Sequence, residues 1–434
     1  MSWKVNKFLF FVIFFSLFSL ALAAAEEGQV IDLKSAIEIA LERNPRLNQI
    51  RKDSEIAHWN QRIILSSYFP QAAAGFSAQR YDNHPSLTYD ENYQFDLVLR
   101  QRLLDLSRIA DIRAASSAKR HQKENQRAYE QVVIFDVIRY FYRSLLSRQE
   151  LEIRKEALSL AEEEFQIAEA RYSQGMVSYY DLLRSESKYL SAKSGLRRSQ
   201  SEHHKSLNDF KNIIGYDPGE KIFLEGDFSF SAEQDYPESL TQTISSLHPR
   251  LAAAAYVVSQ RQRNLSSSRG EFFPRLDLEA VQSASKYSQI PGGQEWDDYW
   301  RVNLKVSFPL FEGARRYFQV NKSHQELEQA RIQEIEILNE IKKDIDSFYQ
   351  DYLAAEEEMV SQKKNVERSR ELYQLIRQRY KVGEASEIEL LDAHLNLIDV
   401  ESAFKEVRYR TIVSYYGVLL AAGQLEVERV ASRE

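Results

Sequence analysis

The strongest constraint on the fold is that the 434-residue sequence repeats itself. Four short motifs of the first half return, in the same order and at nearly constant spacing, in the second half. The matched pairs are residues 44–47 with 248–251, 68–70 with 272–274, 171–175 with 379–383, and 181–183 with 389–391. Repeats that cannot each bury their own apolar face stack against one another. We therefore expect two copies of one structural unit.

The second constraint is the scarcity of turn-forming residues, with 14 Gly and 9 Pro in the whole chain. Residues 107–174 and 314–382 contain neither, and as helices they would each be about 100 Å long at 1.5 Å per residue. Gly175 and Gly383 end these segments, and return helices over 179–214 and 387–422 complete two helical hairpins. In the second long segment apolar residues recur every seven positions, which predicts left-handed supercoiling. The heptad row is Leu338, Ile345, Tyr352, Met359, Val366, Tyr373 and Tyr380.

A shorter helix and two strands precede each hairpin. The first helix is predicted over 33–67, with Asp32 as its N-cap and Pro45 restarting it, and its counterpart over about 239–270. The following segments alternate apolar and polar residues, which predicts four strands of about ten residues each. Their approximate positions are 71–79, 94–100, 275–280 and 300–308.

These strands have the length and alternation of transmembrane β-strands, with one lipid-facing and one polar face. Aromatic residues near their ends are typical of a membrane girdle. The alternative is two hairpins of a water-soluble sheet. The membrane interpretation is favoured once the export signal described next is included.

Residues 1–25 are predicted to be a signal peptide. Lys4 and Lys7 form a positive region, an apolar stretch runs from residue 8 to 22, and small alanines follow at a cleavage site. The alternative, an uncleaved anchor, is disfavoured because the apolar run is about 15 residues, short of the roughly 20 that a spanning helix needs. No later segment is apolar enough to span a bilayer as a helix, so the exported chain is either soluble or a β-barrel.

Four membrane strands require partners, because a spanning sheet must close to satisfy its edge groups. The smallest closed barrel has about eight strands and is filled by side chains, whereas about twelve leave room for an open lumen. Two copies would barely close, and three would form a wider barrel. We therefore favour a trimer.

The signal peptide, the duplicated plan and the two Arg-Tyr-x-x-Gly tips resemble the TolC family of outer-membrane efflux and secretion channels. The resemblance implies a mainly helical fold with membrane strands: a homotrimeric twelve-stranded barrel on a long α-helical periplasmic tunnel. It implies no enzymatic activity and no cofactor, and a location in the outer membrane in contact with its lipid. A periplasmic adaptor (membrane fusion protein) and an inner-membrane pump are the implied partners. The predicted domains are the signal peptide, a first repeat over 26–235 and a second repeat with a C-terminal tail over 236–434.

The resemblance also implies roles for residues at the tips. Glu389 and Asp392 match acidic residues that line the pore constriction, where three-fold symmetry would gather carboxylates into a cation-attracting ring. The alternative is that both acids merely favour the helix dipole. Asp181 and Tyr380 match a hydrogen-bonded pair that holds the closed state, although Tyr380 also fits a heptad core position. The family's lock can include an arginine where this chain has Ala385, so we expect fewer polar contacts in the closed state.

The tip residues Gly175, Met176, Gly383 and Glu384 are the predicted adaptor contacts, because a coaxial partner can reach a tip. Zero cysteine excludes disulfides, thiolate zinc sites and a Cys nucleophile. No phosphate-cradling loop, HExxH motif or nucleophile elbow occurs, and no metal site is predicted. The formal net charge of -7 gives no reason to expect a nucleic-acid partner.

The predicted function is therefore the passive outer-membrane exit duct of a tripartite efflux pump or a type I secretion system. The alternative from another class is a secreted coiled-coil structural or adhesion protein with no channel, and a membrane-associated enzyme is a distant third. Drugs, metal ions, metabolites and proteins are all exported through the architecture that this chain resembles. The cargo, the pump and the adaptor stay open.

Overall fold

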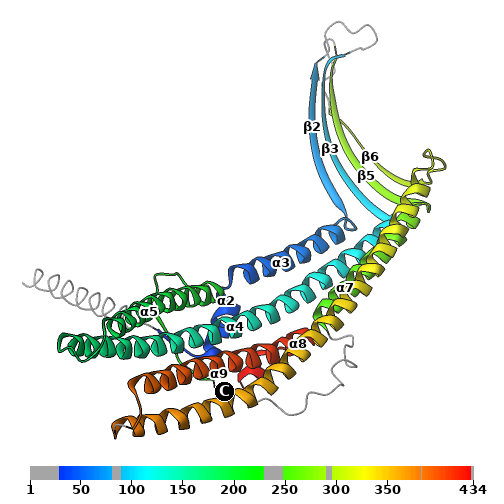
Figure 1. The fold of residues 1–434 in the computed structure, drawn as a ribbon. Helices are drawn as coiled ribbons and strands as arrows, with labels where there is room; N and C mark the ends of the chain where they lie inside the picture. The colour runs from blue at the N-terminus through cyan, green and yellow to red at the C-terminus, as the bar shows by residue number, and fades with distance from the viewer. Residues whose placement is uncertain (1–28, 81–88, 229–247, 290–295, 383, 432–434) are drawn as a thin grey trace, which may run out of the picture. The chain divides into compact units, whose positions relative to one another are not determined.

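The computed structural model describes residues 29–80, 89–228, 248–289, 296–382 and 384–431. The predicted signal peptide and Gly383 lie outside these ranges. The chain forms two compact units, each assembled from stretches that are far apart in the sequence (Figure 1). The hairpin unit comprises residues within 1–48, 128–248 and 340–434, and the sheet unit comprises residues 49–127 and 249–339.

In the sheet unit, a helix leads into each of two strand pairs. The elements are α3 (Pro45–Ser66), β2 (Gln71–Arg80) and β3 (Tyr89–Leu104), and then α7 (Pro249–Gly270), β5 (Arg275–Gln289) and β6 (Asp297–Ser307). The strands form one antiparallel sheet in the order β2-β3-β5-β6 (Figure 1). The helix–strand–strand order thus occurs once in each half, as the duplicated motifs predict.

The predicted strand length of about ten residues holds for β2 and β6 but is wrong for β3 and β5, which have 16 and 15 residues. Both long strands are central and pair on both sides, so their hydrogen bonding continues beyond the alternating segment. Pairing runs as far as Tyr89 opposite Gln289. Polar residues occupy consecutive positions there, which removes the period-two signal from the sequence.

The two faces of the sheet differ in chemistry. One transverse row pairs Ala72, Leu99, Ala280 and Val302, and the next pairs Gln71, Arg100, Glu279 and Asn303. We call these the apolar face and the polar face. Large side chains on the apolar face are uncovered in the single chain: Phe76 is 66%, Trp300 74% and Leu304 62% exposed.

Hydroxyl contacts and a glycine hold the helices of the sheet unit together. The Ser117 and Ser259 hydroxyls lie 3.1 Å apart between α4 (Leu106–Ser173) and α7. Those of Ser268 and Ser323 lie 2.8 Å apart between α7 and α8 (Arg315–Lys381). At Gly270, a Cβ atom would lie 2.6 Å from the backbone nitrogen of Ser107. Only glycine therefore allows this close approach of α7 to the start of α4.

The hairpin unit contains the ends of two long helices and their return partners. α4 (Leu106–Ser173) is followed by α5 (Tyr179–Ile214), and α8 (Arg315–Lys381) by α9 (Glu387–Ala421). These bounds agree with the predicted ones to within one residue at each end. In Figure 1 the two hairpins are coloured cyan to green and yellow to red. None of the helices in the described ranges is long and apolar enough to cross a membrane.

The heptad row of α8 is buried or half-buried at each position from Ile345 to Tyr380. Ile345 and Tyr352 are 2% and 4% exposed. A second seven-residue row of α8 contains Ile341, Ala355 and Ile376 and is interrupted by Ser369. Ser369 is also buried, and its hydroxyl accepts a hydrogen bond of 3.2 Å from the Asn396 amide of α9. The predicted coiled-coil packing of α8 is thus confirmed.

The main hydrophobic core of this unit contains the large aromatic side chains Phe141, Phe210, Tyr415 and Tyr416, from α4, α5 and α9. α2 (Leu33–Arg43) adds apolar residues to it, and the predicted N-cap is confirmed, since the Asp32 carboxylate accepts from a backbone N–H at 3.0 Å. The sequence analysis did not find the short parallel pair β1 (Gln29–Ile31) and β4 (Ile222–Leu224), or α10 (Val427–Ala431).

Candidate functional site: the hairpin tips

The first tip connects α4 to α5 through a glycine turn. Gly175 has φ +71°, in the left-handed region that glycine favours, and no atom lies within 4 Å of where its Cβ would be. Its N–H donates to the carbonyl of Tyr172 at 2.9 Å, and the next N–H, of Met176, donates to that of Arg171 at 2.9 Å. These bonds satisfy carbonyls at the end of α4, as a glycine C-cap does.

Both return helices begin with the same capping box. At α5, the Ser178 hydroxyl accepts from the Asp181 N–H at 3.2 Å, and the Asp181 carboxylate accepts from the Ser178 N–H at 3.2 Å. At α9, the corresponding distances for Ser386 and Glu389 are 3.3 and 2.7 Å. Each box satisfies N–H groups that a helix start leaves without partners.

The capping bonds also set the protonation of the two acids. The side-chain hydrogen bond from Ser178 lowers the pKa of Asp181 below its ordinary value of 3.8. The backbone N–H of Ser386, followed by its hydroxyl, lowers the pKa of Glu389 below 4.5. Both carboxylates are therefore ionised at neutral pH and carry negative charge at the start of a helix, where the dipole favours it.

Of the two predicted constriction residues, Glu389 uses its carboxylate in a hydrogen bond within the described residues and Asp392 does not. The Glu389 carboxylate is held in its capping box, which agrees with the helix-start alternative considered for it. Asp392 lies three residues after Glu389 on α9, which is almost one helical turn. It is exposed, and it has no hydrogen bond or ion pair within the described residues. Its neighbours Leu391 and Ala393 are buried, so the Asp392 side chain points away from the packed face.

The predicted gate pair is not joined within one copy of the chain. Asp181 uses its carboxylate on Ser178, with a hydroxyl bond of 2.6 Å. Tyr380 is half-buried at the end of the α8 heptad row, in agreement with its alternative role as a core residue. Within the described residues no hydrogen bond connects Asp181 to Tyr380. A bond between neighbouring copies stays a prediction.

The described residues of the predicted adaptor contact are accessible. Met176 is 70% exposed, and Tyr179 and Tyr180, which follow it, are 58% and 70% exposed. At the second tip Glu384 is exposed, and its backbone N–H donates to the carbonyl of Arg379 at 2.8 Å. The first tip thus presents Met176, Tyr179 and Tyr180, while the second presents Val382, which is 70% exposed, and the Glu384 carboxylate, which lies 4.0 Å from the Arg379 guanidinium.

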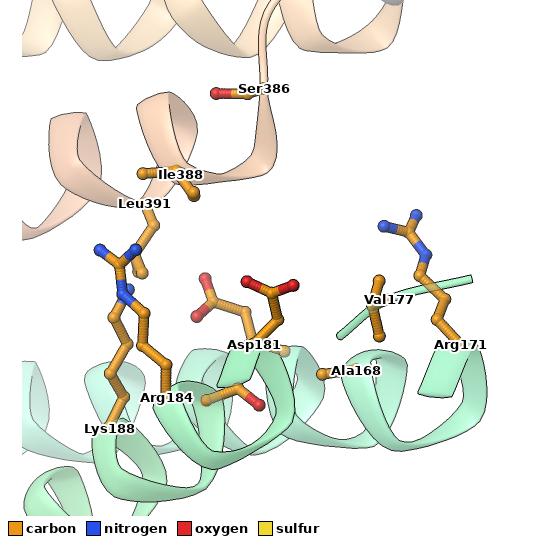
Figure 2. Close-up of a pocket in the computed structure, with 11 residues that line it drawn as sticks. Ala168, Arg171, Val177, Asp181, Arg184, Lys188, Ser386, Ile388 and Leu391 are labelled. Atoms are coloured by element: carbon orange, nitrogen blue, oxygen red, sulfur yellow. The ribbon is translucent and has the colours of Figure 1, made fainter. Parts of the chain in front are cut away.

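A pocket of about 290 Å³ lies between the first tip and the start of α9 (Figure 2). Its apolar lining includes Val177 near the first tip and Ile388 and Leu391 from α9. Figure 2 shows Arg184 and Lys188 reaching from α5 toward Ile388 and Leu391. Arg171 adds a third basic group, and the acids Glu164 and Asp181 also line the pocket, which therefore combines apolar walls with charges of both signs.

The capping boxes are features that the sequence analysis missed, although Ser178-x-x-Asp181 and Ser386-x-x-Glu389 are visible as Ser-x-x-acid patterns. The pocket has no such sequence signal, because it depends on how the two hairpins pack. In the ranges that the structure describes, no group of three or more His, Cys, Asp or Glu side chains could hold a metal ion.

Comparison with known proteins agrees with this architecture. A model of the outer membrane efflux protein family matches residues 36–216 and 240–424, once in each half. The outer membrane efflux protein BepC of Brucella suis is 23% identical over 403 residues, covering 92% of this chain and 86% of BepC. The alkaline protease secretion protein AprF of Pseudomonas aeruginosa is 19% identical over 446 residues, covering 98% of this chain and 89% of AprF.

The fold is also similar to that of the CmeC outer membrane channel of Campylobacter jejuni. The TM-score is 0.81 at 19% identity, over 92% of this chain and 88% of CmeC. The predicted fold class and the resemblance to TolC-like channels are thereby confirmed. Since the family model covers most of both halves, the chain belongs to the outer membrane efflux protein family.

Proposed function

We propose that the protein is the outer-membrane exit duct of a tripartite efflux pump or a type I secretion system. One observation carries the proposal: a sheet with an uncovered apolar face and two edge strands occurs in the same chain as two coiled-coil hairpins. A secreted coiled-coil adhesion protein would have no use for such a sheet. Membership of the efflux protein family supports the same conclusion.

The duct would be a homotrimer in contact with outer-membrane lipid. β2 and β6 are the edges of the sheet, so β6 of one copy would pair with β2 of the next. Three copies of the four-stranded sheet give twelve strands, enough for an open lumen, whereas eight strands would be filled by side chains. Transport through it would be passive, without a catalytic residue, metal or cofactor.

The proposed constriction is a ring of Asp392 carboxylates, with Glu389 contributing charge from within its capping box. Three-fold repetition of two acids would attract cations at the narrowest point. For the gate, we propose that Asp181 of one helix pair meets Tyr380 of its neighbour, with Ala385 leaving that lock short of one polar contact. Opening would then require fewer bonds to break.

The proposed partners are a periplasmic adaptor at the tips, contacting Gly175, Met176, Gly383 and Glu384, and an inner-membrane pump that drives export. The relatives are consistent with both kinds of system. BepC is named an outer membrane efflux protein, and AprF an alkaline protease secretion protein. We also propose that the two repeats cover residues 26–235 and 236–434. Each contains one of the two family-model matches, 36–216 and 240–424, which supports this division.

Membrane fractionation followed by planar-bilayer recording tests this function. A duct is expected to remain in the outer-membrane fraction after salt washing, to migrate as a heat-modifiable oligomer, and to form discrete single-channel currents. The adhesion alternative predicts a salt-extractable protein without conductance. A water-soluble monomer that forms no channel would contradict the proposal.

A further inference from the structure

The polar face of the sheet carries an uneven distribution of charge along the strands. We call its half nearest the starts of β5 and α4 the base. The base holds three arginines that pair with three carboxylates. The pairs are Arg100 with Glu279 at 2.8 Å, Arg102 with Asp277 at 3.0 Å, and Arg275 with Asp105 at 3.9 Å.

Two further cations of the base, Arg301 and Lys305, have no hydrogen bond or ion pair within the described residues. Both lie on β6, where Arg301 is opposite Val281 and Lys305 is opposite Asp277. Glu279 and Asp277 already pair with Arg100 and Arg102, and the charge of Arg301 also acts on Glu279 and on Asp96 of β3. Both side chains are exposed in the single chain.

Closing the sheet would not neutralise these two cations. β6 is an edge strand, and its partner in a ring of copies would be β2, the other edge. β2 has the sequence Gln-Ala-Ala-Ala-Gly-Phe-Ser-Ala-Gln-Arg and contains no acidic residue. The base of the polar face would therefore keep more cationic than anionic side chains in each copy.

The base is also hollowed. A cavity of about 520 Å³ is lined by Arg100, Arg102, Arg108 and Lys305, against only two carboxylates, those of Asp277 and Glu279. Arginine side chains present several donors in a planar fork that suits carboxylate and phosphate oxygens. A concave surface lined mainly by one sign of charge concentrates ions of the opposite sign.

We propose that the base of the polar face is an anion-binding ring that favours cargo carrying phosphate, sulfate or clustered carboxylate groups. This inference rests on the proposed trimeric duct, in which the polar face lines the lumen and three copies contribute Arg301 and Lys305. It adds a cargo preference that the acidic tip residues alone would not produce. The distal half of the same face carries Asp96 and Asp297, so the cationic character is confined to the base.

Single-channel recording of the full-length protein, with inorganic tripolyphosphate as the probe, tests the ring. Tripolyphosphate should block the current, and Arg301→Gln with Lys305→Gln should weaken that block about tenfold or more, at the lower end of the gain that a one-signed cleft gives. The reversal potential in a salt gradient should shift toward cations in the same variant. Arg301→Lys with Lys305→Arg, which keeps the charges, should retain the block.

The matched control removes the same number of cations from the opposite face. Arg80 and Lys286 lie on β2 and β5 at positions that alternate with the polar face. Arg80→Gln with Lys286→Gln should leave block and reversal potential unchanged. Normal conductance with an unchanged block in the Arg301 and Lys305 variant would overturn the anion ring. A wild-type protein without any conductance would instead overturn the duct itself.

Discussion

The two return helices have the same N-terminal cap, and beyond it they present side chains of opposite charge. Each return helix starts with a serine N-cap and an acid three residues later. Beyond the cap, the first tip presents Arg184 and Lys188, whereas α9 has Asp392 at the position equivalent to Arg184. The duplication has thus kept the residues that start the helix and changed the ones that the helix presents. Shared residues account for the fold, and the differing ones are where the two repeats can differ in function.

The largest expected effect separates Asp392 from Arg184, its equivalent in the first repeat. If Asp392 lines the constriction, Asp392→Ala should raise single-channel conductance severalfold and weaken block by a trivalent cation, because three carboxylates leave a narrow ring. Arg184→Ala, at the equivalent position of the first repeat, should change both far less. Equal effects of the two variants would remove the functional difference between the tips.

Because α5 and α9 have the same capping box, loss of the serine cap should destabilise both helix starts equally. Ser178→Ala and Ser386→Ala should each destabilise their helix start by about 1 kcal/mol, the usual cost of losing a serine cap. Hydrogen exchange of tip peptides, read by mass spectrometry, reports such local opening. Each variant should speed exchange only at its own tip. A much larger effect at one tip would show that its cap also supports contacts beyond the helix.

A glycine pair tests whether the first turn depends on backbone conformation alone. Gly175→Ala should destabilise the turn by about 1 kcal/mol, because alanine disfavours φ +71° although nothing crowds the site. Gly195→Ala, within α5 and also uncrowded, should stabilise its helix by up to about 1 kcal/mol. The same exchange measurement compares them, and opposite signs are the expected result.

The smallest effect is a pH dependence shared by both tips. The pKa values of Asp181 and Glu389 are lowered by their capping bonds, so the contribution of each carboxylate to stability is complete above its ordinary pKa. That contribution is lost as the pH falls through the lowered value. Protection of the amides at both helix starts, measured as the exchange rate relative to the intrinsic rate at the same pH, should therefore be complete at pH 5 and fall below pH 3.8 for Asp181 and below 4.5 for Glu389. Asp181→Asn should flatten the profile at the first tip only.

The long helices were predicted well because the residues that begin and end them act locally. Gly175, Pro45 and the heptad row each act on neighbouring residues, so element bounds follow from the order of amino acids alone. The long central strands were underestimated because pairing on both sides, not alternation, decides where they end. The pair β1 and β4 was missed, since three residues carry almost no pattern and the partner lies in the other part of the first repeat.

The candidate site was only partly predictable. The acidic residues at the second tip were predicted from the family resemblance, and the exposed Met176 from its place at a hairpin tip. The pocket beside Arg184 and Leu391 could not, because it arises where two hairpins meet. The contact proposed between Asp181 and Tyr380 joins separate copies, and no periodicity within one chain encodes it.

The arrangement of the sheet has a consequence for how the protein is made. Because β2 and β6 are both edge strands, a single chain exposes two rows of unpaired backbone donors and acceptors next to an exposed apolar face. Such a chain is prone to aggregate in water before it pairs with the other copies. Closure of the sheet must therefore be coupled to insertion into the membrane. Biogenesis then requires chaperones that shield the strands until that step.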